Sequence, residues 1–192
     1  MRRVSIVFFA LLLALAPAAA QNIRDRFTDA ADDAKIHDSG FVCPLKIGDF
    51  ERDAVGEHDA LTRADFCSYS AQGGVYGTVV LMPLAGAYDP KAALAPQVLE
   101  EEATGGKQVA EGTVQFGGRQ VYTRTYETTS LEDLRYRTLF AAAPAGGWAV
   151  EATVEFATPR DDTLERGFLD FVYGAGAAKI TVQPLAAAAA KQ

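Results

Sequence analysis

The sequence predicts an α+β fold in which helices pack on a mainly antiparallel β-sheet. Three features lead to this prediction: stretches rich in β-forming residues, Gly-Gly pairs between them, and two helix signals placed among the strands. Successive glycines supply the positive backbone angles that tight hairpin turns require. Such pairs begin at residues 73, 105, 117 and 146. The predicted order is early strands, a helix, three antiparallel strands and a second helix.

The clearest hairpin is predicted around Gly117-Gly118, because β-branched and aromatic residues lie on either side of this pair. A two-residue turn fixes the register and gives three facing pairs: Phe116 with Arg119, Val114 with Val121, and Glu111 with Arg124. Side chains alternate between the two faces of a strand. Tyr122, Arg124 and Tyr126 are therefore expected on one face of the second strand.

Alternation predicts further strands. Residues 134–143 set Arg135 and Arg137 on alternate positions from their more apolar neighbours. Residues 147–156 show the cleanest pattern, with Glu151 and Glu155 facing outward and five side chains facing inward: Trp148, Val150, Ala152, Val154 and Phe156. Residues 75–82 are apolar on both faces, which predicts a central strand covered on both sides. Two more strands are expected near residues 47–55 and 64–70.

Two helices are predicted between the strands. Asp89-Pro90 provides a capping residue followed by proline in the first helical position, and Pro96 predicts a kink or a later start. Thr158 and Asp161 fit a capping box for the second helix. Its apolar stripe consists of Leu164, Phe168, Phe171 and Val172. A last strand is expected at residues 179–184.

Residues 1–20 have the pattern of a secretory signal peptide. Arg2 and Arg3 precede an apolar run, and small residues stand before Gln21. The apolar run is shorter than the roughly 20 residues of a spanning helix. The sequence therefore predicts a protein that is exported to the periplasm or secreted and then soluble, without a transmembrane segment.

The remaining chain divides into three predicted parts. Residues 21–40 have a thin apolar stripe at helical spacing and are expected to be a weakly helical or mobile lead-in. Residues 41–184 form a single α+β domain, and residues 185–192, rich in alanine, form a disordered tail. His37 lies in the lead-in and is expected to be exposed.

The charge of the mature chain argues against polyanionic partners. Loss of Arg2 and Arg3 with the signal leaves 16 of the 18 basic residues against 25 acidic ones, a net charge of −9. An acidic chain without a basic tract is poorly suited to nucleic acid or to anionic membrane surfaces. The expected partner is an envelope protein or a small ligand of unknown identity.

The two cysteines, Cys43 and Cys67, are predicted to form a structural disulfide. A lipoprotein needs a cysteine directly after the signal, where Gln21 stands. Two cysteines and two histidines without metal-ligand spacing argue against a zinc site, and no C-x-x-C redox pair is present. A bridge suits an oxidising compartment and stabilises by about 3 to 3.5 kcal/mol for a loop of this length.

No familiar catalytic or cofactor motif occurs. The sequence has no G-x-S-x-G, no phosphate-binding glycine loop before a helix and no H-E-x-x-H. We therefore expect no cofactor and no metal. His58, between Glu57 and Asp59, is expected to be a surface histidine in the loop closed by the bridge. It is a general base only if a pocket brings an acid and a hydroxyl to it.

One group of side chains suggests a surface for binding. If the strands pair in the predicted order, five residues share a sheet face with Glu111, Glu151 and Glu155: Tyr122, Arg124, Tyr126, Arg135 and Arg137. Cross-strand pairs of opposite charge explain such a face without any ligand. Tyrosine and arginine are also enriched at binding hot spots. The ladder of charge pairs is the favoured interpretation, and the binding surface is the alternative.

The order of elements resembles the Mog1/PsbP-like fold, which periplasmic proteins similar to DcrB share. The resemblance covers residues from about Phe41 to Gly174, and Gly147-Trp148-Ala149-Val150 is its one local match. A cystatin-like or NTF2-like sheet is the alternative. The resemblance implies a non-catalytic binding or accessory module of the envelope. The second hypothesis is a small periplasmic hydrolase or isomerase with an unrecognised site.

Overall fold

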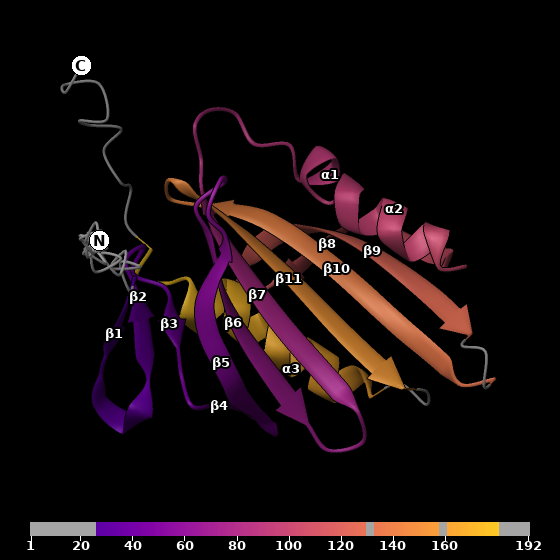
Figure 1. Ribbon diagram of the computed structural model, residues 1–192, viewed down its shortest axis with the longest axis horizontal. Coiled ribbons are helices and arrows are strands. Elements are labelled where there is room, and N and C mark those ends of the chain that lie inside the picture. The colour runs from indigo at the N-terminus through magenta and orange to yellow at the C-terminus, as the bar shows by residue number, and fades with distance from the viewer. Residues whose placement is uncertain (1–25, 130–132, 158–160, 181–192) are drawn as a thin grey trace, which may run out of the picture.

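An eight-stranded antiparallel sheet is the centre of the protein. The computed structural model describes residues 26–129, 133–157 and 161–180. The strand order is β4-β5-β6-β7-β11-β10-β9-β8, so two four-stranded meanders meet where β7 pairs with β11 (Figure 1). The strands are β4 (Lys46–Ile47), β5 (Phe50–Asp59), β6 (Ala64–Ala71), β7 (Val75–Pro83), β8 (Lys107–Phe116), β9 (Arg119–Thr129), β10 (Arg135–Ala145) and β11 (Trp148–Ala157).

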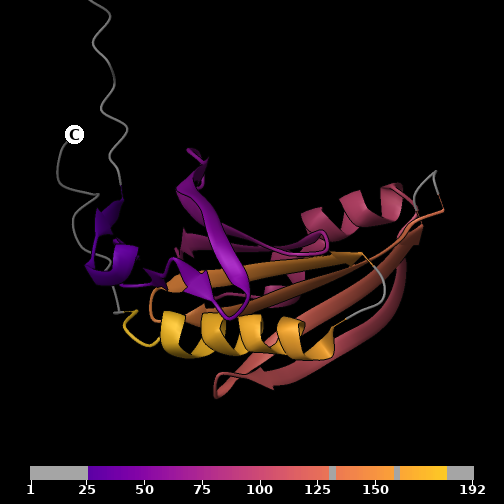
Figure 2. The same cartoon turned by 90° about the horizontal axis from the view of Figure 1, so that it is seen from below.

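Helices lie on both faces of this sheet. α3 (Asp162–Phe171) continues into a π-helical turn, η2 (Val172–Gly176), on one face. α1 (Pro90–Ala93) and α2 (Ala95–Ala103) lie on the other, so the sheet runs between the two helical layers (Figure 2). The predicted α+β class is confirmed. In the described part of the chain, every helix is too short or too polar to cross a membrane.

The main core lies between α3 and the sheet. The five side chains predicted to face inward from β11 are all buried: Trp148, Val150, Ala152, Val154 and Phe156. From α3 and η2, Phe168, Leu169 and Tyr173 pack onto them. The predicted hairpin register is also observed, with Glu111 facing Arg124. These elements follow the period-2 and period-3.6 patterns of the sequence closely.

The opposite face of the sheet departs from the prediction in two places. Glu151, expected outside, is only 8% exposed because α1 and α2 cover this end of β11. β7 is central, as predicted, but only its α3 side is closed. On its other side Tyr76 is 55% exposed, so the prediction of cover on both faces is wrong there. The short helices reach only part of this face.

The stretch before Phe41 is structured, so the predicted lead-in is wrong for its described residues. A three-stranded sheet forms from β1 (Phe27–Asp29), β2 (Lys35–His37) and β3 (Val42–Cys43), with a short 3-10 turn, η1 (Ala31–Asp33), between the first two. His37 is buried, not exposed. Its ring packs edge-on against Trp148, with the two ring centroids 5.0 Å apart. Strands this short gain partners only through tertiary pairing, so periodicity does not reveal them.

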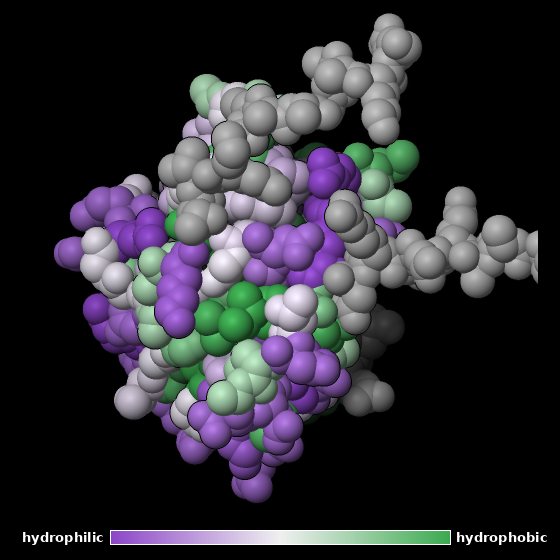
Figure 3. Space-filling model, turned by 90° about the vertical axis from the view of Figure 1, so that its left-hand side faces the viewer, coloured by the Kyte–Doolittle hydropathy of each residue, from purple (hydrophilic) through white to green (hydrophobic). Residues whose placement is uncertain are grey.

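Apolar side chains reach the surface at the end of the molecule that carries this small sheet. Viewed from the left of Figure 1, this face has an apolar patch at its centre with hydrophilic side chains around it (Figure 3). Phe27 and Phe41 nevertheless join the main core. The small sheet is thus packed onto the domain rather than trailing from it.

The helix ends follow local chemistry. Asp89 caps α1 by accepting the backbone N–H of Lys91 at 2.9 Å, and the helix breaks at Leu94 before Pro96, as predicted. α3 begins after Asp161, which is itself the capping residue, so the expected capping box from Thr158 is wrong. Thr158 and most of the expected strand at residues 179–184 lie outside the described residues.

The disulfide between Cys43 and Cys67 is present, as predicted. Both cysteines are buried, their Cα atoms are 6.3 Å apart, and the bridge ties β3 of the small sheet to β6 of the large one. It therefore holds two separately paired sheets together.

Replacement of both cysteines by alanine should lower the free energy of unfolding by about 3 kcal/mol, since the unfolded chain regains the entropy of the closed loop. Chemical denaturation of the oxidised protein and the double variant measures this. Equal midpoints would contradict a stabilising bridge.

Candidate functional site

The five residues predicted to share a binding face lie on opposite faces of the sheet. Strand pairing sets Arg124 opposite Phe140 and Arg137 opposite Glu127, so even-numbered positions of β10 share a face with even-numbered positions of β9. Tyr122, Arg124 and Tyr126 lie under α1 and α2, whereas Arg135 and Arg137 lie on the α3 side. The prediction of one shared surface is wrong, because it assumed the other offset between these strands.

On the α1–α2 side, the predicted residues form a closed network around Glu111. Its carboxylate accepts from Tyr122 Oη at 2.6 Å, Lys91 Nζ at 2.8 Å and Arg124 Nη2 at 3.3 Å. The bonds from Lys91 and then Tyr122 lower the pKa of Glu111 to about 2. Tyr126 is fully buried. Such an arrangement matches a ladder of charge pairs, and the binding role of these residues stays a prediction.

On the α3 side, Arg137 is likewise held within the protein. Its guanidinium lies 3.7 Å from the carboxylates of both Glu127 and Glu165. Glu165 belongs to α3 and is buried. This pairing anchors the start of α3 to β10, so it contributes to the scaffold.

Glu151 is a buried carboxylate between the sheet and the first helix pair. It accepts from Tyr88 Oη and Gln97 Nε2, both at 3.2 Å. Burial raises the pKa of Glu151, and the two hydrogen bonds oppose this only in part. Burial and the nearby Glu151 also raise the pKa of Tyr88. Ionisation of this carboxylate therefore costs stability in the folded protein.

Substitution Glu151→Gln should change how stability depends on pH. The folded pKa of Glu151 lies above its unfolded value, so its favourable contribution is present below the unfolded pKa and is lost as pH rises through the folded pKa. We therefore expect the free energy of unfolding of the variant to increase relative to that of the wild type as pH rises from about 4 to 7.5. Denaturation at several pH values tests this, with exposed Glu57→Gln as control; parallel curves would contradict it.

A buried Ser-His-Asp chain joins the small sheet to β6, and sequence reasoning missed it. His37 Nδ1 lies 2.8 Å from Ser39 Oγ, and His37 Nε2 lies 3.0 Å from Asp65 Oδ2. Arg26 pairs with the same Asp65 oxygen at 3.0 Å. The residue types are those of hydrolytic triads. The spacing of His37 and Asp65 along the sequence does not predict this pairing.

The chain is built as a structural link. Ser39 N–H donates to His37 Nδ1, and Phe41 N–H donates to Ser39 Oγ, each at 3.1 Å. Burial lowers the pKa of His37, which favours the neutral ring. Ser39 and His37 are each 1% exposed, so a substrate cannot reach the hydroxyl. The hydrogen bonds instead fix the turn between β2 and β3.

His58, the histidine considered for the enzyme hypothesis, lies on β5 rather than in a loop. The centroids of its ring and of the Phe66 ring lie 6.5 Å apart. Among the residues that the structure describes, neither a carboxylate nor a hydroxyl forms a hydrogen bond or an ion pair with His58. The arrangement that would mark it as a general base is therefore not observed.

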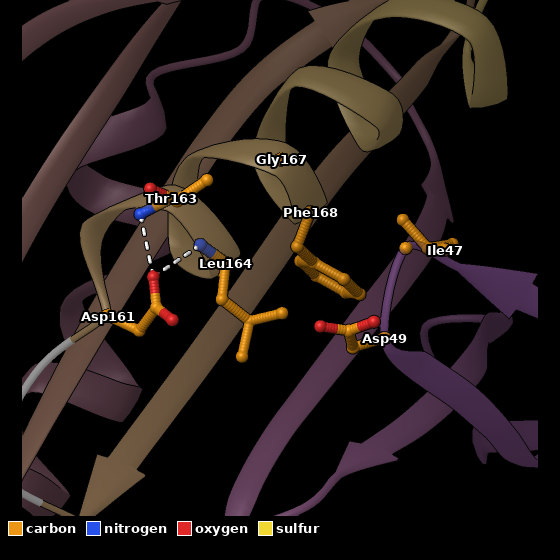
Figure 4. A pocket seen from close by; sticks show the side chains of 8 residues that line it. Ile47, Asp49, Asp161, Thr163, Leu164, Gly167 and Phe168 are labelled. Atoms are coloured by element: carbon orange, nitrogen blue, oxygen red, sulfur yellow. Dashed lines mark hydrogen bonds between the residues drawn. The ribbon is translucent and has the colours of Figure 1, made fainter.

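A hollow of about 300 Å³ opens between the start of α3 and the turn that joins β4 to β5 (Figure 4). Ile47, Leu164 and Phe168 supply its apolar surface, and Asp49, Asp161 and Thr163 supply polar groups. Three of these six, Asp49, Asp161 and Thr163, are exposed, while Ile47 and Phe168 are buried. The hollow thus joins solvent to the edge of the core.

Local structure fixes each wall of this hollow. Gly48 has a φ of +58°, which lets the chain reverse between β4 and β5 and bring Ile47 against α3. The Phe168 ring packs against Phe50 at 4.7 Å and Tyr69 at 5.7 Å between centroids. Asp161 accepts the N–H groups of two α3 residues, at 2.9 and 3.0 Å. The site is preorganised by the fold.

Gly167 is the least expected residue of the hollow. It lies inside α3, is exposed, and a Cβ built on it would meet nothing within 4 Å. A helical glycine costs about 1 kcal/mol relative to alanine. A second, shallower hollow of about 400 Å³ lies along the same flank and shares Thr163 and Gly167 with the first. Gly167 borders both hollows and places no side chain between them.

Comparisons with known proteins give a distant likeness to a solved structure. No protein-family model and no curated protein sequence matches this chain. The fold is similar to the crystal structure of LpqN, which is involved in cell envelope biogenesis of Mycobacterium tuberculosis, over 64% of this chain and 76% of that chain. The identity is 12% and the TM-score 0.36. The Mog1/PsbP-like resemblance stays a prediction.

Proposed function

We propose that this protein is an exported, non-catalytic binding module of the cell envelope. Its ligand or partner lies on the flank of α3, in the hollow around Gly167. Export is supported by the signal-like pattern of residues 1–20. The buried disulfide suits the oxidising compartment that export leads to.

The hollow is the observation that carries this proposal. Binding sites are concave, mainly apolar and formed in advance, with a few polar groups that set orientation. Leu164 and Phe168 give the apolar surface, and the carboxylates of Asp49 and Asp161 stand beside it (Figure 4). The walls are fixed by a turn, a capped helix and a packed ring. Little entropy is lost in ordering such a site on binding.

The lining favours binding over catalysis. Its carboxylates, hydroxyl and apolar groups hold a ligand by charge, hydrogen bonding and burial. The residue types that suit hydrolysis, Ser39, His37 and Asp65, lie together elsewhere and are buried. The function that the geometry supports best is therefore recognition.

Filling the hollow should abolish binding without unfolding the protein. Gly167→Met adds a side chain where a Cβ meets no neighbour, and the helix should tolerate it. Capture from envelope extract should yield a species that the wild type retains and this variant loses. Melting temperatures of the two proteins should agree within a few degrees.

Gly112→Met on β8 is the matched control, since a Cβ there also meets nothing within 4 Å. This variant should capture the same species as the wild type. If Gly167→Met captures that species as well as the control does, the hollow is not the binding site.

A further inference from the structure

We propose that the hollow beside Gly167 receives a lysine side chain of a partner polypeptide that crosses α3. The recognised chemistry is a primary ammonium on an apolar stem. This inference rests on the proposed function and names the partner of the same site.

The charge around the hollow is the first reason. Asp161 stands beside Leu164 and Asp49 beside Phe168, on the two sides of the Leu164 side chain (Figure 4). Among the described residues, Asp49 has no hydrogen bond or ion pair, and none of the lining residues is a lysine or arginine. The nearby Arg166 is paired with Asp170 at 3.3 Å. Among the described lining residues, a cation entering the hollow therefore meets two carboxylates and no lysine or arginine.

The helix end does not reverse this preference. The start of α3 contributes about half a positive charge through its backbone dipoles. The two carboxylates of Asp49 and Asp161 outweigh it. The local field therefore favours a positive group over a negative one.

The oxygen positions favour an ammonium over a guanidinium. Asp161 uses Oδ1 to accept two helix N–H groups, which leaves Oδ2 for a partner. A guanidinium binds best when both oxygens of one carboxylate face its planar fork. An ammonium has three donors that can reach single oxygens of two separate carboxylates. Asp49 and Asp161 both line the hollow and belong to separate elements, so each can supply such an oxygen.

The size of the hollow favours a single side chain. A volume of about 300 Å³ lies at the lower limit of pockets for small molecules. Ile47, Leu164 and Phe168 present apolar surface against which methylene groups of a stem can be buried. The apolar surface and the carboxylates together match the two parts of a lysine side chain.

The neighbouring hollow favours a polypeptide as the source. It continues along α3 past Gly167 to Arg166 and Asp170. Because Gly167 lacks a side chain, the backbone of a partner can approach α3 closely between the two hollows. A free amine would occupy only the first hollow, whereas a peptide would contact both.

NMR titration of the exported protein tests this proposal. The probes are acetyl-Ala-Lys-Ala-amide, the same peptide with norleucine for lysine, and n-butylammonium. The lysine peptide should shift the amide signals of Asp49, Thr163 and Gly167 and bind about tenfold more tightly than the norleucine peptide, because charge-assisted hydrogen bonds are lost. Weaker binding at high salt is also expected.

Matched variants locate the charge. Asp49→Asn combined with Asp161→Asn should weaken the lysine peptide about tenfold, and asparagine caps a helix as well as aspartate, so α3 is kept. Glu57→Gln, seven residues beyond Phe50 on β5, should leave binding unchanged. Equal binding of the lysine and norleucine peptides, or no loss in the double variant, would overturn the proposal.

The remaining outcomes are also decisive. If n-butylammonium binds as tightly as the lysine peptide, the polypeptide occupant is wrong. If Gly167→Met loses the captured species while the lysine peptide never binds, the hollow is a binding site for another chemistry, and only this inference fails.

Discussion

The Phe168 ring packs against Gly77 and so joins α3 to the middle of the sheet. A Cβ at Gly77 would lie 2.6 Å from the Phe168 ring, so β7 and α3 approach closely only because this residue is glycine. β7 is the strand of the first meander that pairs with β11 of the second. The ring therefore fixes α3 over the line where the two meanders meet. The same ring forms part of the hollow.

The helices cover the two faces of the sheet to different extents. The α3 side is closed by a helix with a strong apolar stripe, whereas α1 and α2 contribute mainly Leu94 and Val98 to their side. Polar networks around Glu111 and Glu151 fill part of the remaining space. Within each network the side chains hydrogen-bond to one another. The hollow on α3 differs because the carboxylate of Asp49 is not engaged by any described residue.

Sequence patterns predicted most strands and the hairpin register, because each depends on residues close in the chain or on a single alternating face. The disulfide was predicted from the cysteine count and from the signal-like pattern of residues 1–20. They failed where two elements must first meet. The offset between β9 and β10 placed Arg124 and Arg137 on opposite faces, and periodicity within one strand does not determine such an offset. Alternation along its strand predicts that Glu151 is exposed, but a helix with few apolar residues covers it. The hollow left one signal, Gly167 inside a predicted helix.

Packing requires glycine at position 77 but not at position 167, and the proposed binding site is what explains Gly167. The most direct measurement is the free energy of unfolding of Gly77→Ala and Gly167→Ala. The Phe168 ring is enclosed by Phe50 and Tyr69 and has little room to withdraw, so Gly77→Ala should destabilise by about 1 to 3 kcal/mol. Gly167→Ala should stabilise by about 1 kcal/mol. A loss of stability in Gly167→Ala, or none in Gly77→Ala, would contradict this difference between the two glycines.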